Sequence, residues 1–428
     1  MKWPTYPLSK IAVDLQPGFA RQPGAGDTSL PQLRTNNVSP DGRIDLALVK
    51  EVPASKKECE RYSLQKGDVL FNNTNSVDLV GKTALFDLDG GPFLFSNHMT
   101  RVRINHEVAD PRFIARCLFW TWKIGGFRMM VTRWVNQAAI NKTMLGSVIV
   151  QLPALSEQRR IVEILDQADA LRKKHAEADA ITARILSALF FKMFGNPATN
   201  SMNWPMAPLS SFFTSDRHGP RCGPFGSALK KHEYVDRGIP VWGIENVLPN
   251  RFAEDGSLFI TEDKYHKLIA YSVVHGDILI SRAGTVGRMC VATPTVVRSI
   301  IGTNLIRLAF DLEALDPEYF SAMFTCFPQI SVRFRAASDA GAYSFMNTSI
   351  LKSLQIPVPP AKLQRRFAHY VSAVRALEQS HAATREQIRR LFESLLHRAF
   401  TGALTAKWNE AHMKELLAEM EFQAECLS

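Results

Sequence analysis

Apolar residues recur at helical spacing over one long stretch in the middle of the chain. They follow steps of three and four residues, with two polar positions among them: Ile161, Leu165, Ala168, Leu171, His175, Ala178, Thr182, Ile185 and Leu189. This spacing is typical of a coiled-coil seam and predicts a helix within residues 152–197. About 39 residues at 1.5 Å each make a helix of roughly 58 Å, longer than one ordinary globular domain. We therefore expect this helix to pair with another.

The same pattern returns near the end of the chain, at an offset of 206 residues. Both segments open with a proline followed five residues later by Gln-Arg-Arg, from Pro153 to Arg160 and from Pro359 to Arg366. The apolar seam follows in the same phase: Phe367, Val371, Val374, Leu377, His381, Thr384, Ile388, Leu391 and Leu395. Residues 358–400 therefore predict a second long helix, and the repetition predicts two related halves.

The regions in front of the two helices also resemble each other. Gly276-Asp277-Ile278-Leu279 repeats Gly67-Asp68-Val69-Leu70, and Asp316-Pro317 repeats Asp110-Pro111. Short strand-like runs and a helix in each region predict mixed domains at residues 1–151 and 198–357. The offset changes only near residues 72–79 and 222–231. A common framework that carries loops of different length is typical of a recognition scaffold.

The last segment, residues 401–428, has apolar residues at helical spacing, among them Trp408, Leu416, Met420 and Phe422. It predicts a short docking helix packed on its own chain, and an inter-subunit helix is the alternative.

The composition points to an anionic partner. Among 428 residues, 51 Lys and Arg stand against 41 Asp and Glu, a net charge of +10 that suggests nucleic acid. Six cysteines without a Cys-x-x-Cys pair indicate neither a zinc cage nor a disulfide framework. The sequence has no signal segment and no run of 18 apolar residues, so we expect a soluble cytoplasmic protein with no membrane partner.

The chain has the order domain, helix, domain, helix. Pro-x-x-x-x-Gln-Arg-Arg opens each helix, and Gly-Asp-hydrophobic-hydrophobic precedes a Val-Gly-basic turn in each domain. This arrangement resembles the specificity subunit of type I restriction-modification systems. The resemblance covers essentially the whole chain. It implies an α+β fold in which two homologous mixed α/β target-recognition domains are separated by two long helices. These helices would form an antiparallel intramolecular coiled coil with pseudo-twofold symmetry. One departure is Leu363 before Gln364, where the first helix has the acidic Glu157 that the family usually carries.

The resemblance also implies a non-catalytic role. Each domain would read one half of an asymmetric bipartite site on double-stranded DNA. Two methylation subunits would dock on the helices, and two restriction subunits would join them. S-adenosylmethionine, ATP and Mg are then expected in those partner subunits, and this chain is expected to have no cofactor or metal of its own.

Candidate DNA contacts come from loops at matching places in the two domains. In the first domain they are Asn72, Asn73, Thr74, Asn75 and Lys82 after a strand, and Arg133, Gln137, Asn141 and Lys142 before the long helix. In the second they are Arg282, Arg288, Arg333, Arg335, Tyr343 and Asn347, together with Arg221, Lys230 and Lys231 in an inserted segment. Amides suit adenine edges, and Arg and Lys suit guanine and phosphate. Solvated turns of similar composition are the competing interpretation.

Two other classes of function remain as alternatives. A coiled-coil adaptor without DNA recognition would explain the helices but not the two elaborate domains. A self-sufficient nuclease or methylase would need a catalytic motif; Leu79-Val80-Gly81-Lys82-Thr83 imitates a phosphate-binding loop, but Ser76 stands where that loop needs glycine. His175 and His381 occupy matching seam positions, and we interpret them as polar register markers and not as a metal site.

Overall fold

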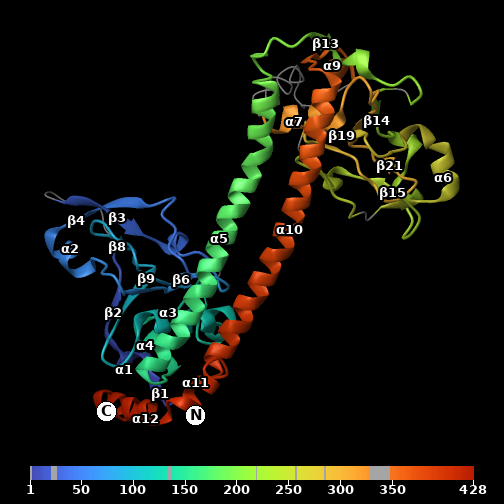
Figure 1. The fold of residues 1–428 in the computed structure, drawn as a ribbon. Coiled ribbons are helices and arrows are strands. Elements are labelled where there is room, and N and C mark those ends of the chain that lie inside the picture. Colours follow the sequence, from blue (N-terminus) through green and yellow to red (C-terminus); the bar gives the residue numbers. More distant parts are fainter. Residues whose placement is uncertain are drawn as a thin grey trace. The chain divides into compact units, whose positions relative to one another are not determined.

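The chain folds into two compact units. A computed structural model describes residues 2–20, 27–133, 137–217, 219–255, 258–283, 286–327 and 348–428 (Figure 1). Unit 1 comprises Met1–Lys174 with Arg385–Ser428, and unit 2 comprises His175–Thr384. Each of the two long helices contributes one part to each unit.

Unit 1 is built on an antiparallel sheet with strands in the order β2 (Ala12–Pro17), β9 (Met99–Ile104), β5 (Val69–Asn72) and β7 (Thr83–Leu85). Three smaller sheets accompany it: β4 (Lys50–Ala54), β3 (Thr28–Leu33) and β8 (Leu94–Phe95); β10 (Thr132–Arg133), β11 (Ala138–Ala139) and β6 (Thr74–Asn75); and β1 (Thr5–Pro7) with β12 (Ile149–Gln151). The short helices are α1 (Leu8–Ile11), α2 (Lys56–Tyr62), α3 (Pro111–Lys123) and α4 (Lys142–Gly146).

Unit 2 repeats the main sheet and two of the three smaller ones. Its main sheet has the order β14 (Arg221–Cys222), β22 (Leu305–Leu308), β19 (Ile278–Ser281) and β20 (Met289–Val291). The other pairings join β18 (Phe259–Ile260), β15 (Ile239–Trp242) and β21 (Ile300–Ile301); β16 (Val247–Leu248) and β17 (Arg251–Phe252); and β13 (Met206–Pro208) and β23 (Gln355–Pro357). Its short helices are α6 (Glu262–Lys267), α7 (Pro317–Thr325) and α9 (Thr348–Ser353). Even the parallel pairing of β3 with β8 recurs, between β15 and β21.

The central strand of each main sheet is buried on both faces, which explains its continuous apolar run. In β5, Val69 and Phe71 belong to one core cluster and Leu70 to another. In β19, Ile278 and Ile280 likewise belong to one core cluster and Leu279 to another. Because successive strand residues point to opposite faces, each unit has one core against its helices and a second on the other side of the sheet.

The two long helices are α5 (Leu155–Phe194) and α10 (Ala361–Phe400), each 40 residues long. In unit 1, Ile161 and Leu165 of α5 share a core cluster with Phe392 and Leu396 of α10. In unit 2, the rings of Phe190 and Phe367 lie 5.5 Å apart, and those of His175 and His381 lie 5.4 Å apart. Later α5 residues therefore meet earlier α10 residues, so the two segments of unit 2 run in opposite directions.

The predicted seam is wrong in part of its length. Leu171, Leu377 and Leu391 were expected in it, but they are 45%, 40% and 47% exposed. Near the end of α10, Phe392 and Leu396 are buried, one position after the predicted residues. A straight α-helix drifts by about 20° per heptad relative to a 3.5-residue repeat. Over several heptads this drift carries the buried stripe to the neighbouring position.

The C-terminal segment packs on unit 1 as two short helices, where the sequence predicted one. It forms α11 (Ala406–Ala411) and α12 (Met413–Leu427), and Gln423 Nε2 donates to the backbone oxygens of Val108 and Pro153 at 2.6 and 3.2 Å. The buried Glu157 carboxylate accepts hydrogen bonds from Trp3 Nε1 at 3.1 Å, Thr405 Oγ1 at 2.6 Å and Asn409 Nδ2 at 2.7 Å. This carboxylate thus joins the N-terminal domain, α5 and the C-terminal segment.

Within the described ranges, no helix has the combination of length and apolar character that crossing a bilayer requires.

Candidate nucleic-acid interface

A small sheet in unit 1 brings together two groups of residues that the sequence presented separately. Strand β6 pairs with β11 and β11 with β10, in a register that places Asn75 opposite Ala138 and Ala138 opposite Arg133. Gln137 immediately precedes β11. The predicted contacts after β5 and before α5 thus form one surface, in which Arg133 and Gln137 are exposed and Asn75 is half-buried.

The start of α4 adds two polar residues after that sheet. Asn141 caps the helix, because its Oδ1 accepts a hydrogen bond from the Met144 backbone N–H at 2.8 Å, and Lys142 is the first helical residue. Both residues are exposed. Asn141 therefore has a local structural role, while a contact of either residue with DNA stays a prediction.

Three of the predicted contacts in unit 1 are instead used inside the domain. The Lys82 ammonium is buried and donates to the backbone oxygens of Val38 and Thr35, and burial lowers the pKa of Lys82. Asn72 Nδ2 donates to the Thr35 oxygen at 3.1 Å, and Asn73 Nδ2 donates to Thr100 Oγ1 at 3.0 Å. Exposing these side chains would break internal hydrogen bonds. This geometry argues against direct DNA contact, and we assign the three side chains to holding the loop.

In unit 2, the predicted arginines lie against aromatic rings. The Arg282 guanidinium lies 4.5 Å from the ring centre of Phe225, and that of Arg221 lies 5.2 Å from the ring centre of Tyr271. Such stacking restricts the orientation of a guanidinium and leaves its edge able to donate. Arg288 is half-buried, whereas Lys230 and Lys231 are exposed. The other predicted residues, Arg333, Arg335, Tyr343 and Asn347, lie outside the described residues.

Two buried arginines were missed by the sequence analysis. Arg101 Nη1 donates to the backbone oxygens of Arg61 and Ser63, and Arg307 Nη1 donates to those of Ala270 and Ser272. Arg101 and Arg307 stand 206 residues apart, on matching strands β9 and β22. Burial lowers the pKa of Arg307 to about 10. In β22 the available signal was an arginine among apolar residues, whereas β9 also contains Thr100 and Arg103. Because both guanidinium groups are buried, they are not candidates for a DNA contact.

The glutamine of each Pro-x-x-x-x-Gln-Arg-Arg segment fastens a long helix to its domain. Gln158 Oε1 accepts from the Asp110 backbone N–H at 2.9 Å, and Gln158 Nε2 donates to the Pro153 oxygen at 2.8 Å. Gln364 makes the same pair of bonds, to Asp316 and to Pro359, at 2.9 and 2.8 Å.

Both glutamines act where a domain helix begins. Asp110 and Asp316 cap α3 and α7, and each is followed by a proline at the first helical position. We call these glutamine contacts the latches. Each latch joins the start of a long helix to the start of a domain helix. The orientation of the domain on its helix is fixed by this contact.

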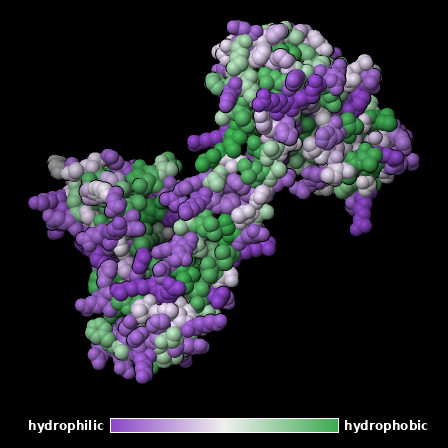
Figure 2. Space-filling view, in the orientation of Figure 1, coloured by the Kyte–Doolittle hydropathy of each residue, from purple (hydrophilic) through white to green (hydrophobic). Residues whose placement is uncertain are grey.

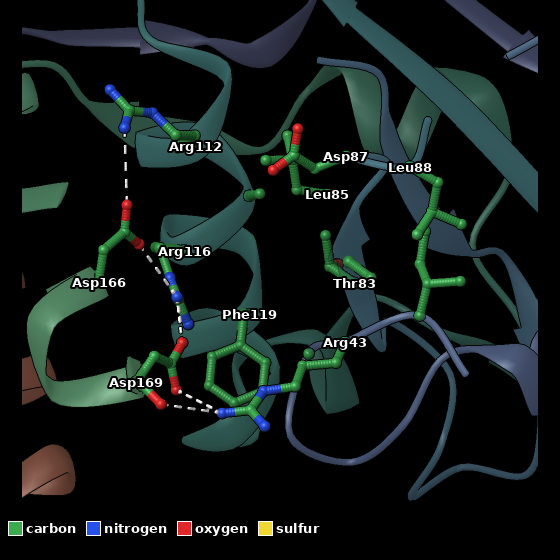
Figure 3. A pocket seen from close by; sticks show the side chains of 14 residues that line it. Arg43, Thr83, Leu85, Asp87, Leu88, Arg112, Arg116, Phe119, Asp166 and Asp169 are labelled. Atoms are coloured by element: carbon green, nitrogen blue, oxygen red, sulfur yellow. Dashed lines mark hydrogen bonds and ion pairs between the residues drawn. The ribbon is translucent and has the colours of Figure 1, made fainter. Parts of the chain in front are cut away.

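A cavity of about 380 Å³ lies between the domain and α5 in unit 1 (Figure 3). Its charged lining residues are Arg43, Asp87, Arg112, Arg116, Asp166 and Asp169. Figure 3 shows the arginines pointing toward the two carboxylates of α5, to which dashed lines connect them. Because the charges are paired, this cavity is not a basic surface for DNA.

Metal-ligating groups and thiols are the remaining candidates for chemistry in the part of the chain that the structure describes. There, no group of three or more His, Cys, Asp or Glu residues is arranged to hold a metal ion. Burial raises the pKa of the Cys117 and Cys290 thiols to about 12, so neither is an activated nucleophile.

The sequence matches a family model described as type I restriction modification DNA specificity domain twice, over residues 31–182 and 221–390. The chain belongs to this family. Its two matched regions fall in the two repeated domains and extend into the long helices that follow them.

Two relatives are similar to this chain, the first of them over most of its length. The chain is 22% identical over 413 residues to the "Putative type I restriction enzyme MjaX specificity subunit" of Methanocaldococcus jannaschii, covering 95% of this chain and 94% of that protein. It is 27% identical over 200 residues to the type I restriction enzyme EcoKI specificity subunit of Escherichia coli, which covers 45% of this chain and 42% of that protein.

Solved structures show the same fold. The type I restriction-modification S subunit from M. genitalium is 15% identical, with a TM-score of 0.55 over 94% of this chain and 96% of that one. A chain from a structure of complex assembly and conformational transition of a type I R-M system is 20% identical, with a TM-score of 0.58 over 94% of this chain and 98% of that one. The α+β fold with two specificity domains and long helices is thereby established, and the chain is a type I restriction-modification specificity protein.

Proposed function

We propose that this protein selects the DNA site of a type I restriction-modification complex, with each domain reading one half of an asymmetric bipartite site. The observation that carries the proposal is the repetition of one strand topology, with different side chains at the matching loops. A shared framework gives both domains the same docking geometry, and different loop residues give each domain its own sequence.

The two long helices would set the distance between the half-sites. The contacts of Phe190 with Phe367 and of His175 with His381 support an antiparallel coiled coil with pseudo-twofold symmetry. The latches of Gln158 and Gln364, equal in geometry, support the same symmetry. A stiff helical spacer makes the gap between half-sites a constant, so that both domains meet the same face of the duplex.

In unit 1, the surface formed by β6, β11, β10 and the start of α4 would contact the DNA. Arg133 and Gln137 are exposed there and carry the donors and acceptors that read base edges in the major groove. Lys142 supplies a charge for phosphate contact, which orients the domain without reading sequence. In unit 2, Arg221, Arg282, Arg288, Lys230 and Lys231 are the corresponding candidates.

The chemistry would come from partners. We propose that two methylation subunits, which use S-adenosylmethionine, dock on the long helices, and that two restriction subunits with ATP and Mg complete a cytoplasmic complex. Exposed apolar residues of the helices support docking: Leu171, Ile181, Phe191, Leu377 and Leu391. Figure 2 shows hydrophobic side chains scattered among hydrophilic ones on the visible surface, so no single apolar patch dominates it.

The test compares DNA affinities of the chain with its methylation subunit. Methylome sequencing of a host carrying both identifies the site, and fluorescence anisotropy on target and scrambled duplexes over a range of salt then measures selectivity. We expect a target preference of at least roughly 1,000-fold. Arg133→Ala and Gln137→Ala should reduce that preference in one half-site only, whereas Lys57→Ala, an exposed change on α2, should not. An adaptor would show no preference, and a self-sufficient enzyme would methylate or cut alone.

A further inference from the structure

The joint between domain and long helix carries opposite charges in the two units. Positions 169 and 375 correspond through the offset of 206 residues, and they are Asp169 on α5 and Arg375 on α10. On the domain helices, Glu318 of α7 pairs with Arg375, and the residue that corresponds to Glu318 is Arg112 of α3, which pairs with Asp166 three residues before Asp169. At these positions the long helix therefore carries carboxylates in unit 1 and an arginine in unit 2, although Arg172 of α5 also donates to Asp41 of the domain at 2.8 Å.

In unit 1, the carboxylates of α5 accept hydrogen bonds from arginines of the domain. Asp169, whose side chain is 12% exposed, pairs with Arg116 and with Arg43, the latter at 3.2 Å. Asp166 pairs with Arg116 at 3.3 Å and with Arg112 at 3.5 Å (Figure 3). Two segments of the domain, α3 and the loop at residue 43, are held by these carboxylates.

In unit 2, the direction of donation is reversed. Arg375 donates both terminal nitrogens of its guanidinium to the Glu318 carboxylate, one of them at 2.8 Å. It also donates to the backbone oxygen of Asn250 at 2.9 Å, in the loop that corresponds to the Arg43 loop of unit 1. The side chains of Glu318 and Arg375 are 15% and 25% exposed, so this fork-shaped pair is largely shielded from water.

The reversal makes the wrong combination of domain and helix repulsive. The unit 2 domain on the unit 1 helix would set the Glu318 carboxylate against Asp166 and Asp169, and Ala322 would stand where unit 1 has Arg116. Partly desolvated like charges destabilise strongly, and such repulsion is an effective way to reject a wrong partner. The latches discriminate little, because Gln158 and Gln364 share their bonds to the capping aspartate and to the proline, and only a bond from Gln158 to the Val108 oxygen at 3.2 Å differs.

We propose that these reversed ion pairs, which we call the charge code, allow each recognition domain to dock only on its own long helix. The inference rests on the proposed function for its biological meaning: the code fixes which half-site is read at which end of the complex. The pairing itself is a property of the folded chain and can be measured without DNA. Asp169 and Arg375 are positioning residues in this scheme.

The first experiment reverses the code within unit 2 of the full chain. Arg375→Glu should lower the unfolding midpoint of unit 2 by roughly 10 °C, because it sets two carboxylates against each other. The double variant Glu318→Arg with Arg375→Glu should recover most of that loss. Arg398→Glu, an exposed charge reversal on the same helix, is the matched control and should change the midpoint little. Failure of the double variant to recover would overturn the charge code.

The second experiment places the wrong domain on a helix. Residues 1–151 of the full chain are replaced by a second copy of residues 202–357, and docking is read by limited proteolysis and by the thermal midpoint. We expect the copied domain to be cleaved at least about tenfold faster than the native one. Converting the facing positions of α5 to their unit 2 counterparts, by Asp166→Ser with Asp169→Arg, should restore resistance.

The control for that chimera is Lys173→Gln, which converts an exposed residue of the same helix to its unit 2 counterpart and should restore nothing. A chimera that is as resistant as the parent protein, or one that the α5 changes do not repair, would contradict the proposal. If instead the parent protein shows no DNA preference while the repair succeeds, the proposed function fails and the charge code stands.

Discussion

Units 1 and 2 share their framework but differ in what packs around the start of the long helix. In unit 1, Glu157 is a buried carboxylate with three hydrogen-bond donors, two of them from the C-terminal segment. In unit 2, the corresponding residue is Leu363, which packs against the apolar core. Trp204, the counterpart of Trp3, donates instead to the backbone oxygen of Phe194 at 3.0 Å. The departure of the second helix from the usual acidic residue thus follows from the C-terminal segment, which packs only on unit 1 among the described residues.

This difference teaches that a duplicated fold can keep its latches while changing the contacts around them. The glutamine bonds are equal in both units to within 0.1 Å, at 2.9 and 2.8 Å. The buried carboxylate and the joint charges differ. Residues that define the backbone frame are therefore shared, and residues that decide what packs on the frame are not.

The largest expected effect comes from making unit 1 resemble unit 2. Glu157→Leu leaves the donors of Trp3, Thr405 and Asn409 without an acceptor in a buried place, so it should destabilise unit 1 by about 3–5 kcal/mol. Calorimetry should show a lowered transition for unit 1 and an unchanged one for unit 2. Glu163→Leu, at an exposed position of the same helix, is the control. Equal stability of Glu157→Leu and the parent would contradict the role of this carboxylate.

The latches should behave alike in both units. Gln158→Ala removes three side-chain hydrogen bonds and Gln364→Ala removes two, and each leaves a backbone N–H at the joint unpaired, at a cost of about 2–3 kcal/mol. Chemical denaturation of the two variants measures the two costs. A large loss in one unit with none in the other would break the equivalence of the two domain joints.

Within unit 1, exposed and buried candidates should separate. Arg133→Ala should weaken binding of the target duplex about tenfold without changing stability, because its side chain is exposed. Lys82→Met should lower stability while binding at low temperature is retained, because its ammonium holds the backbone at Thr35 and Val38. Anisotropy and thermal unfolding, measured on the same preparations, distinguish the two. A Lys82→Met variant that is stable but has lost DNA affinity would show that Lys82 contacts DNA.

The smallest effect is a difference in pH response between the units. Burial raises the pKa of Glu318 and of Asp316 above the ordinary carboxyl values. Carboxyls with a raised pKa in the folded state bind protons more readily when folded. Unit 2 should therefore gain stability, by less than about 1 kcal/mol, as the pH falls from neutral through the raised pKa values toward the ordinary ones. Calorimetry across this range should show the gain, and Glu318→Gln should reduce it.

The sequence predicted the large features well because they repeat. The seam of 152–197 and its copy at 358–400 predicted two long helices, and the structure has them as α5 and α10. The matching Gly-Asp segments predicted equivalent strands, now seen as β5 and β19. These features depend on local periodicity and on comparison within the chain, and neither requires knowledge of tertiary contacts.

Side-chain roles were harder to predict, because they depend on distant partners. Lys82 and Asn72 look like surface residues of a polar loop, yet both bind the backbone of Thr35, which is far away in sequence. The latch bond from Asp110 to Gln158 crosses 48 residues. The association of Asn75 with Arg133 depends on a pairing through β11 that short strands do not reveal. Composition suggests such residues, but only the fold tells which of them are already engaged.

The packing of the chain's last residues has a consequence for protein synthesis. The core of unit 1 includes Phe392, Leu396 and Leu427, whereas unit 2 ends at Thr384. The domain that leaves the ribosome first therefore lacks part of its core until residues 385–428 have been made, while the second domain has all its parts earlier. An incomplete chain would hold Ile161 and Leu165 uncovered, and chaperones and proteases would recognise it. We therefore expect unit 2 to reach its folded state before unit 1 during synthesis.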